Sequence, residues 1–547
     1  MYMRKIYWMT VAVVVCCLSS CYEDKGNYDY KLMNDVTVNF TMEATEFVMG
    51  DVLKIEPQLA FSLGEETNKL AYSWSLNRRQ ISTDRNLNWM ADEEGKYMDL
   101  RLTVTDTETG VSYFYASSIT ITSPYVNSAW VVLSEKEDGT AMLTYLRPTT
   151  KIVPGENGKE DESVYDCAVT KDVYGISNAG SSLGGKPVSI SQHFVSLWPE
   201  DKPQDFTSWL WLVQQGGQGT IDVSGSTYKT EGTLPSMFIH GAYPQGFEPW
   251  RVYDMLYLSM AIGMDGKVYT RIKDSYKLFN NSSFMDELPL SYRQQPVDGT
   301  MVVRAPRFCE HGGTLLYDKN SKRYFHITDY QSWNGRKYCG QLIVPSVTNE
   351  SIYERNPDWG KLDDMSDYEV LYVDAHSDDS YMGLKYTAVL RKSNRYFLQD
   401  FTIGDYYGGG SIDAEINSQT DVTSELGAIV KEDSQFALYY AQDYRPYLLI
   451  SSGNSLYFYY FNGSKVYKYH QFDAPIKSID VNNSAYQGDA GVGLENGEFY
   501  VLDFSTSVIR DVMNTSDSKE KIRFKQGGLG KVIEVIYKWK QAANWVM

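Results

Sequence analysis

Residues 256–272 read Leu256-Tyr257-Leu258-Ser259-Met260-Ala261-Ile262-Gly263-Met264-Asp265-Gly266-Lys267-Val268-Tyr269-Thr270-Arg271-Ile272. Two runs rich in apolar and aromatic residues, which β-strands favour, flank the turn at Asp265-Gly266. The stretch therefore predicts a β-hairpin. This arrangement occurs seven times after Pro124. Its turns lie near Asp138-Gly139, 216–219, Asp265-Gly266, 318–322, 392–394, Gly453-Asn454 and Asn496-Gly497.

The repeated hairpins predict a seven-bladed β-propeller over residues 129–547. Intervals of roughly 40 to 80 residues between hairpins suit blades with uneven insertions, because each blade buries its faces against its neighbours. Both ends of this region are strand-like, at Trp130-Val131-Val132-Leu133 and at residues 531–539, and together they could complete one blade. The alternative for this region is a pair of β-sandwiches.

Residues 36–123 form a separate, smaller β-rich segment. Short strand-like runs at 36–40, 52–55, 70–76 and 98–104 are separated by turn residues at intervals typical of a sandwich. Ser123-Pro124 interrupts strand pairing after them, so we expect a domain boundary between Ile121 and Ala129. The whole chain is therefore predicted to be all-β, with an immunoglobulin-like sandwich followed by a propeller.

The first residues are typical of an export signal. Arg4 and Lys5 precede an apolar run over residues 6–18 that is too short to cross a bilayer as a helix. Leu18-Ser19-Ser20-Cys21 then resembles the bacterial lipobox, which implies that residues 1–20 are removed and that Cys21 is acylated. Several acyl chains anchor a protein stably to a membrane surface. Residues 21–35 would form the linker, and the alternative is a plain signal peptide with a chance cysteine.

Two stretches carry a resemblance to a known family, Cys21-Tyr22-Glu23-Asp24-Lys25-Gly26-Asn27-Tyr28-Asp29-Tyr30 and Gly95-Lys96-Tyr97-Met98-Asp99-Leu100-Arg101-Leu102-Thr103-Val104-Thr105-Asp106. They are similar to the PKD-like lipoproteins of Bacteroidetes. The resemblance implies that Tyr97 turns a corner and that Leu100, Leu102 and Val104 face a core containing Trp74. It also implies association with SusC/SusD-type outer-membrane importers. Glu23-Asp24 resembles the signal that sends such lipoproteins to the cell exterior.

The net charge, the hydropathy and the cysteine content limit which partners, membrane spans and disulfides the chain can have. The chain has 51 basic and 70 acidic residues, a net charge of -19, and loss of Arg4 and Lys5 with the signal would make it -21. Such a surface repels nucleic acid, so no nucleic-acid partner is expected. No later apolar run is long enough for a transmembrane helix. Of the cysteines beyond Cys21, Cys309 and Cys339 could pair across the shorter loop, or these two and Cys167 could be buried free thiols.

No catalytic or metal-binding signature stands out. The sequence has no zinc-binding His-Glu-x-x-His, no phosphate-binding glycine loop and no nucleophile elbow. Cys309-Glu310-His311 could place a thiol near an imidazole, but adjacent strand residues point to opposite faces. Asp374-Ala375-His376-Ser377-Asp378-Asp379 offers oxygen ligands for calcium without the glycine and glutamate of an EF-hand. We therefore expect no catalytic residues, no metal and no cofactor.

Aromatic residues in turn-like segments are the best candidates for a binding role. Loops reach solvent, and an aromatic ring there offers a flat apolar face to a sugar ring or a peptide side chain. Alternatively, each ring packs over its own blade. The favoured function is a surface lipoprotein that binds a peptide or glycan nutrient, docks on an importer, or both. A propeller hydrolase or lyase and a scaffold without ligand are the alternatives. The candidate residues are Trp198, Trp250, Trp333, Trp359, Tyr406 and Tyr407.

Overall fold

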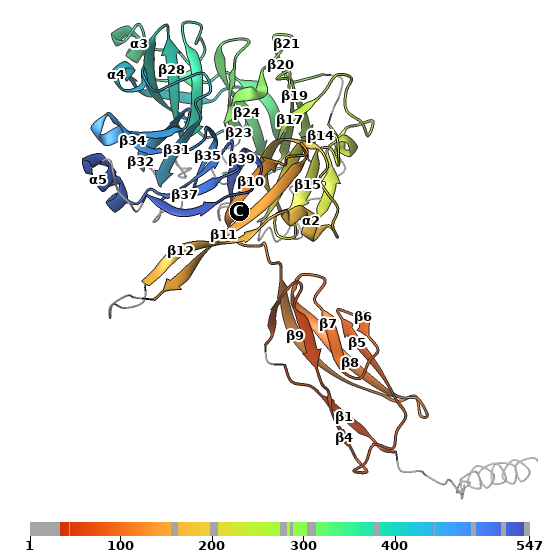
Figure 1. Ribbon diagram of the computed structural model, residues 1–547. Coiled ribbons are helices and arrows are strands. Elements are labelled where there is room, and N and C mark those ends of the chain that lie inside the picture. Colours follow the sequence, from red (N-terminus) through yellow and green to blue (C-terminus); the bar gives the residue numbers. More distant parts are fainter. Residues whose placement is uncertain are drawn as a thin grey trace, which may run out of the picture. The chain divides into compact units, whose positions relative to one another are not determined.

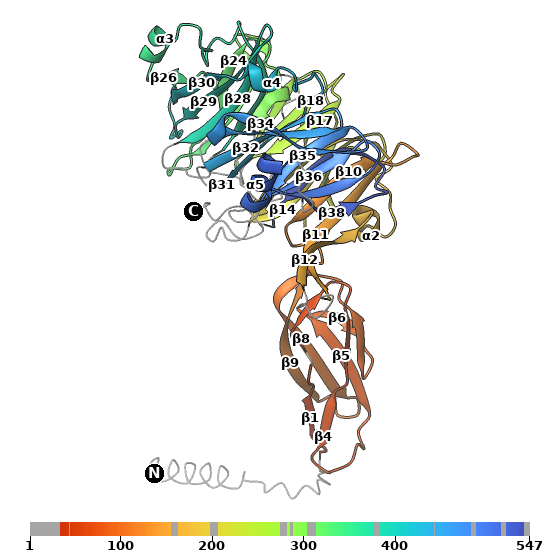
Figure 2. The same ribbon diagram turned by 60° about the vertical axis from the view of Figure 1, so that its left-hand side comes forward.

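A computed structural model describes the chain over residues 33–42, 44–154, 162–196, 206–273, 282–284, 288–303, 313–376, 383–441, 444–482, 488–515 and 521–540. Strands make up most of the regular structure, so the prediction of an all-β chain is confirmed. The chain divides into two compact units, Met1–Thr122 and Ser123–Met547, called unit 1 and unit 2 (Figure 1, Figure 2). The first is drawn in red and orange, and the second in orange to blue.

Unit 1 is built from one large and two small sheets, all formed by its own strands. The predicted runs at 36–40, 52–55, 70–76 and 98–104 all lie in or overlap strands. The large sheet has the order β2(Glu46–Val48), β9(Ser112–Thr122), β8(Gly95–Asp106), β5(Leu70–Leu76) and β6(Arg79–Ser82). The two small sheets pair β1(Val36–Asn39) with β4(Gln58–Phe61) and β3(Val52–Ile55) with β7(Leu87–Met90).

The core of unit 1 follows from the alternation along β8. Leu100, Leu102 and Val104 are fully buried, and Leu102 lies opposite the buried Trp74 of β5. These side chains share one apolar cluster, as the resemblance implied. Tyr97 has a φ of 55° at a shift of register between β8 and β9, so it lies at an irregularity that bends the strand.

Unit 2 contains seven sheets of three to five strands in its described part, together with the short ribbon β20(Ser291–Tyr292) and β21(Gln295–Pro296). The first three sheets, in bonded order, are β12(Glu162–Thr170)-β11(Ala141–Val153)-β10(Ala129–Glu135)-β39(Lys531–Lys538), β13(Lys186–Ser196)-β14(Phe206–Gln215)-β15(Ile221–Ser224)-β16(Thr230–Thr233) and β17(Pro249–Asp254)-β18(Leu258–Gly263)-β19(Val268–Ile272).

The remaining four sheets continue in chain order. They are β22(Val302–Val303)-β23(Gly313–Asp318)-β24(Arg323–Gln331)-β25(Lys337–Ile343), β26(Ser346–Val347)-β30(Asp413–Asp421)-β29(Arg395–Ile403)-β28(Leu384–Lys392)-β27(Glu369–Ala375), β31(Phe436–Ala441)-β32(Tyr444–Ser452)-β33(Ser455–Tyr460)-β34(Lys465–Gln471) and β35(Ile476–Asn482)-β36(Asp489–Leu494)-β37(Phe499–Asp503)-β38(Ile522–Gln526).

The seven hairpins predicted from the sequence are all present, one in each sheet. Each predicted turn joins two strands that pair in antiparallel fashion, from β10 with β11 to β36 with β37. The two ends of unit 2 meet, because β39 pairs with β10 from Ala129 opposite Lys538 to Glu135 opposite Lys531. The first sheet is therefore completed by the last strand, as the sequence led us to expect.

Seven clusters of buried apolar side chains lie between the described sheets of unit 2. Six of them join sheets that follow one another along the chain. The seventh contains Trp130 of the first sheet and Phe499 of the seventh, so it joins the last sheet to the first. Each sheet therefore packs against two others. That the sheets are the blades of a propeller stays a prediction.

Helices are few and short in the part of the chain that the structure describes. The α-helices are α2(Val173–Ser177), α3(Ser351–Arg355), α4(Thr423–Leu426) and α5(Thr506–Thr515), and 3₁₀ turns occupy Pro235–Met237, Gly299–Met301 and Phe461–Gly463. The longest, α5, buries Val508, Ile509 and Val512 on one face, against the cluster between the sixth and seventh sheets. Within the described residues, no helix has the length and apolar character needed to span a membrane.

Candidate binding site

Trp333 is the most exposed of the aromatic candidates. It lies in the turn between β24 and β25, where the Ser332 amide donates to the Arg336 carbonyl (2.9 Å) and the Gly335 amide donates to the Ser332 carbonyl (2.8 Å). Gly335 has a φ of 82°, which a glycine adopts without strain. This tight turn presents an indole that is 97% exposed. Isolated exposed apolar residues are normal on protein surfaces. Whether Trp333 belongs to a binding surface therefore depends on the residues around it.

Further aromatic rings gather at the base of the same hairpin. Tyr330 and Tyr338 lie opposite each other on β24 and β25, with ring centroids 6.3 Å apart. The loop after β29 brings Tyr406 and Tyr407 beside them, at 6.0 and 6.5 Å from Tyr330. We call Tyr330, Tyr338 and Tyr407, together with Trp333 in the turn of the hairpin, the aromatic patch. It spans neighbouring elements of the fourth and fifth sheets.

The two adjacent tyrosines of this loop have different environments. Tyr407 is 74% exposed, and its hydroxyl donates to Asp405 Oδ2 (3.0 Å). Tyr406 is only 3% exposed; its hydroxyl donates to the Gly409 carbonyl (2.7 Å) and accepts from the Gly409 amide (3.1 Å). The expectation that Tyr406 offers an exposed face to a ligand is therefore wrong. Its ring is buried and its hydroxyl bonds within its own loop, which supports the position of Tyr407.

The other candidates are not part of this patch. Trp250, on β17, is partly buried beside the cluster between the third and fourth sheets, and the Arg251 guanidinium lies 5.1 Å from its ring. Trp359 is partly buried against the cluster between the fourth and fifth sheets. Both rings thus pack over sheets, which is the alternative weighed for each of them. Trp198 lies outside the described residues.

Sequence reasoning missed Tyr330 and Tyr338 because both lie in ordinary strand-like runs. Only the register of β24 against β25 places them on one face. The Arg336 guanidinium also lies over the Tyr338 ring, at 4.8 Å, and adds a cationic group to the patch. The signal available in the sequence was the hairpin flanking Trp333, with a tyrosine three residues before it and another five residues after it.

A second candidate is a cavity of about 400 Å³ lined by edge strands of unit 2. Its walls come from β17, β22, β27, β31, β35 and β39, each of which is the edge strand of a different sheet. We call it the edge-strand cavity. Six separate sheets therefore present one edge to a common space.

The carboxylates of the edge-strand cavity all have partners on the chain. Glu534 forms an ion pair with Arg251 (2.8 Å) and accepts from the Ile190 amide (2.9 Å). Asp480 Oδ2 accepts from the Tyr537 amide (2.6 Å). Asp374 Oδ2 accepts from the Tyr372 hydroxyl (2.8 Å). These bonds join edge strands to one another or hold side chains within one strand, so they stabilise the walls of the cavity.

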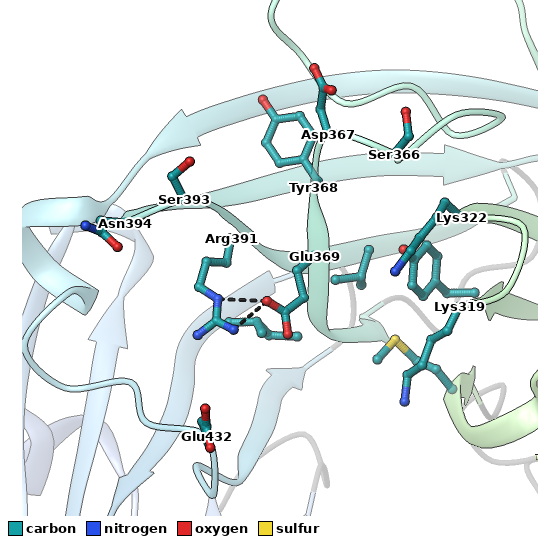
Figure 3. A pocket seen from close by; sticks show the side chains of 14 residues that line it. Lys319, Lys322, Ser366, Asp367, Tyr368, Glu369, Arg391, Ser393, Asn394 and Glu432 are labelled. Carbon is teal, nitrogen blue, oxygen red and sulfur yellow. Dashed lines mark hydrogen bonds and ion pairs between the residues drawn. The ribbon is translucent and has the colours of Figure 1, made fainter. Parts of the chain in front are cut away.

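A larger pocket of about 870 Å³ lies at the turns of the fourth and fifth sheets (Figure 3). Lys319 and Lys322, from the turn between β23 and β24, line one side of it. Glu369 faces Arg391 near the middle, with Glu369 Oε2 at 2.8 Å from Arg391 Nε. We call this the turn pocket. Asp367 and Glu432 also line it, so three basic side chains face three acidic ones, with the two lysines together on one side.

A buried ionic cluster joins the second and third sheets. His193 Nε2 lies 2.8 Å from Asp222 Oδ1, and Lys273 Nζ lies 3.1 Å from Asp254 Oδ1, with all four side chains almost wholly buried. Burial alone would raise the pKa of Asp254, but the neighbouring cations outweigh it and hold that pKa below its ordinary range. Groups so enclosed cannot meet a ligand in this conformation, so the cluster acts in packing.

The remaining sequence motifs offer no assembled centre in the described part of the chain. Cys309-Glu310-His311 lies outside it. Cys167 and Cys339 are buried free thiols, and burial raises the pKa of each to about 12. Asp374 lies in β27, and residues 377–379 of that motif are outside the described part. Across the ranges that are described, no three histidine, cysteine or carboxylate side chains come together as metal ligands.

Comparison with known proteins identifies one family domain. The PKD-like family matches residues 21–187, so the match continues past residue 123, where we expected that domain to end, through β10, β11, β12 and α2. No curated protein matches the chain. A similar solved structure is a quinonprotein alcohol dehydrogenase-like protein from Bacteroides thetaiotaomicron VPI-5482, with 11% identity and a TM-score of 0.39, covering 93% of this chain and 100% of that one.

Proposed function

We propose that this protein is a lipid-anchored component of the outer membrane, facing the cell exterior, that binds a peptide or glycan nutrient, docks on a SusC/SusD-type importer, or both. The lipobox-like Leu18-Ser19-Ser20-Cys21 supports the anchor, and Glu23-Asp24 supports the orientation. The PKD-like match over residues 21–187 supports the link to importer-associated lipoproteins. Unit 2 supplies the binding surface.

Unit 2 is, in this proposal, a seven-bladed propeller closed by β39. Three observations support it: seven sheets in chain order, seven apolar clusters that join each sheet to the next and the last to the first, and a cavity lined by edge strands of six sheets. A pair of sandwiches would pack sheets face to face in twos, and would not place each sheet between two neighbours.

The aromatic patch is the observation that carries the binding function. Trp333 and Tyr407 expose most of their rings, and Tyr330 and Tyr338 extend the apolar surface between neighbouring sheets. Rings held on short turns lose little conformational freedom on binding, and they combine an apolar face with a polar group. Such a surface suits a sugar ring, a peptide side chain or the surface of a partner.

Trp333→Ala and Tyr407→Ala should each weaken binding several-fold without unfolding the protein. A stacking aromatic contributes on the order of 0.5–1.5 kcal/mol beyond the area it buries, and neither side chain belongs to an apolar core. The measurement is affinity for hits from a glycan array and a peptide array, with Tyr97→Ala in unit 1 as the exposed-aromatic control. Variants that keep full affinity for every hit would show that the patch is not the contact.

Cys21→Ala should release the protein from membranes, because the acyl chains are its only proposed apolar anchor. The measurement is partition between membrane and soluble fractions after metabolic labelling with palmitate. Cys339→Ala serves as the matched control, because it removes a buried thiol and leaves the signal intact. An unlabelled wild-type protein, or a Cys21→Ala variant still in the membrane fraction, would overturn the anchor.

A propeller hydrolase or lyase acting on glycan or peptide is the second candidate function. The observation in its favour is the edge-strand cavity, where Asp374, Asp480 and Glu534 bring three carboxylates to one space. Acid and base carboxylates at a suitable separation are the usual requirement for glycoside hydrolysis. Turnover abolished by Asp374→Asn or Asp480→Asn in a correctly folded protein would favour this function over binding alone.

A further inference from the structure

A pocket of about 700 Å³ lies between turns of the third and fourth sheets. Its lining comes from three places: the turn between β18 and β19, the ribbon of β20 and β21, and the turn between β23 and β24. We call it the arginine pocket, after Arg293 and Arg323. It lies at the opposite end of β24 from the aromatic patch, because Arg323 begins that strand and Tyr330 lies near its end.

Two guanidinium groups converge on one ring in this pocket. Arg293 Cζ lies 5.1 Å and Arg323 Cζ lies 5.2 Å from the centroid of Tyr292. Arg323 makes only long hydrogen bonds, from Nη1 to the Tyr292 hydroxyl (3.5 Å) and from Nε to the Ser321 carbonyl (3.4 Å). The ring stabilises each cation, and a bound anion would add charged hydrogen bonds to the guanidinium groups.

Neither arginine forms an ion pair with a carboxylate of the described residues. Arg251, Arg391, Arg395 and Arg523, by contrast, each have a carboxylate oxygen within 2.8 Å. Arg147, Arg336 and Arg355 also lack such a partner among the described residues, but Arg293 and Arg323 line one pocket together. The pocket therefore holds unused positive charge on a negatively charged protein.

The carboxylates closest to the arginines in sequence and space are already engaged. Asp265 pairs with Lys267 (2.7 Å). Asp318 is buried and accepts from the amides of Asp298, Asn320 and Ser321, at 2.9 to 3.1 Å. Hydrogen bonds from Ser366 are the main cause of the lowered pKa of Asp364, and the positive charge of Arg323 lowers that pKa further. These groups leave the guanidinium donors free to meet an external anion.

The backbone places Arg293 over the ring at some cost. Arg293 and Gln294 form the two-residue turn between β20 and β21 and have φ values of 48° and 68°. Left-handed conformations are unfavourable for residues other than glycine, and this turn type usually contains asparagine and glycine. A strained turn that carries a charged side chain into a pocket is consistent with a functional site.

We propose that the arginine pocket binds a carboxylate or sulfate group of an acidic oligosaccharide. Arginine recognises both groups through paired hydrogen bonds. Gln295 adds a side-chain amide to the lining, whereas Asn320 Nδ2 already donates to the Pro296 carbonyl (3.1 Å) and Ser321 Oγ to Asp318. The proposal rests on the proposed function, because it takes the ligand to be a nutrient. Of the two nutrient classes, it selects the glycan.

The turn between β23 and β24 extends this cationic surface. Lys319 and Lys322 of the same turn line the turn pocket on its other side (Figure 3), and Lys319 Nζ donates to the Thr300 hydroxyl (2.8 Å). An oligosaccharide with a charge on successive sugars could cross the turn and meet both pairs of cations. A single charged monosaccharide would meet only one pair.

The test is isothermal titration calorimetry on the full Cys21→Ala chain with a galacturonate hexamer, a sulfated hexamer, the methyl-esterified neutral hexamer and hexaglutamate. We expect a charged hexamer to bind and the neutral one not to bind. Arg293→Gln and Arg323→Gln should each weaken binding roughly tenfold, as for loss of a charged hydrogen bond. Arg395→Gln, which removes an exposed arginine paired with Asp421, should leave it unchanged.

Several outcomes would overturn the proposal. They are no binding of either charged hexamer, equal binding of the neutral hexamer, equal or tighter binding of hexaglutamate, or binding insensitive to both arginine variants. Arg293 lies on an exposed two-residue turn, so its variant carries the test should Arg323→Gln fail to fold. Trp333→Ala and Tyr407→Ala, measured in parallel, report on the proposed function separately, because they lie at the other end of β24.

Discussion

Trp130→Ala is expected to lower the free energy of unfolding by about 3–5 kcal/mol, whereas Trp333→Ala should change it by less than about 0.5 kcal/mol. The two substitutions remove the same side chain from opposite environments. Trp130 is fully buried, and its ring lies 4.8 Å from Tyr537 and 6.0 Å from Phe499. Trp333 is 97% exposed. The difference between the unfolding free energies of the two variants therefore measures how much the buried side chain of Trp130 stabilises the fold.

That place is the junction between the first and last sheets of unit 2. The cluster around Trp130 contains side chains of β10, β37 and β39, so the cavity left by alanine opens between sheets joined by the closing strand. The measurement is calorimetric unfolding of the full chain, because two units need not unfold together. Equal melting of the Trp130→Ala and Trp333→Ala proteins would show that this junction does not hold unit 2 together.

The unfolding free energy should rise with pH between about 7 and 10 because of Lys538. This lysine is fully buried, and its ammonium donates to the carbonyls of Tyr125 (2.8 Å) and Gly225 (2.7 Å). Burial lowers its pKa from 10.5 to about 7. Between these two values the unfolded chain binds more protons than the folded chain, so stability increases as the pH rises. Over this range the free energy of unfolding rises by about 3–5 kcal/mol. Below about pH 7 the lysine is protonated in both states, so it adds no further dependence on pH.

Lys538→Met isolates this effect. The variant should show a flatter dependence of stability on pH above 7, because no group titrates at that position. It also leaves two carbonyls without their donor, which costs roughly 1–3 kcal/mol at every pH. The measurement is denaturant unfolding of both proteins at pH 7, 8, 9 and 10. Parallel curves for the two proteins would show that Lys538 keeps its ordinary pKa in the folded state.

The strands of this protein could be predicted because their signals are local. A glycine or asparagine turn between two apolar runs predicts a hairpin without knowledge of the rest of the chain, and all seven such hairpins are present. The resemblance to PKD-like lipoproteins likewise implied that Leu100, Leu102 and Val104 share a core with Trp74. The pairing of β39 with β10 spans most of unit 2, yet both strands were visible because each end of the region is strand-like.

The binding surfaces could be predicted only in part, because they depend on which loops become neighbours. Trp333 and Tyr407 were visible as aromatic residues in turns, but the sequence does not say that Tyr406, beside Tyr407, points into its own loop. Arg293 and Arg323 lie over the same ring, that of Tyr292, because a two-residue turn packs near the start of β24. The separation of two residues along the sequence does not predict whether they come into contact in this way.

We propose that unit 2 binds its ligand and leaves it intact. Mass spectrometry of glycan-array and peptide-array hits, incubated with the purified full chain and then recovered from it, tests this most directly. Ligands should be recovered with unchanged mass, and the Trp333→Ala/Tyr407→Ala double variant should retain several-fold less. Shorter or eliminated products formed by the wild-type protein, or equal retention by the double variant, would contradict it.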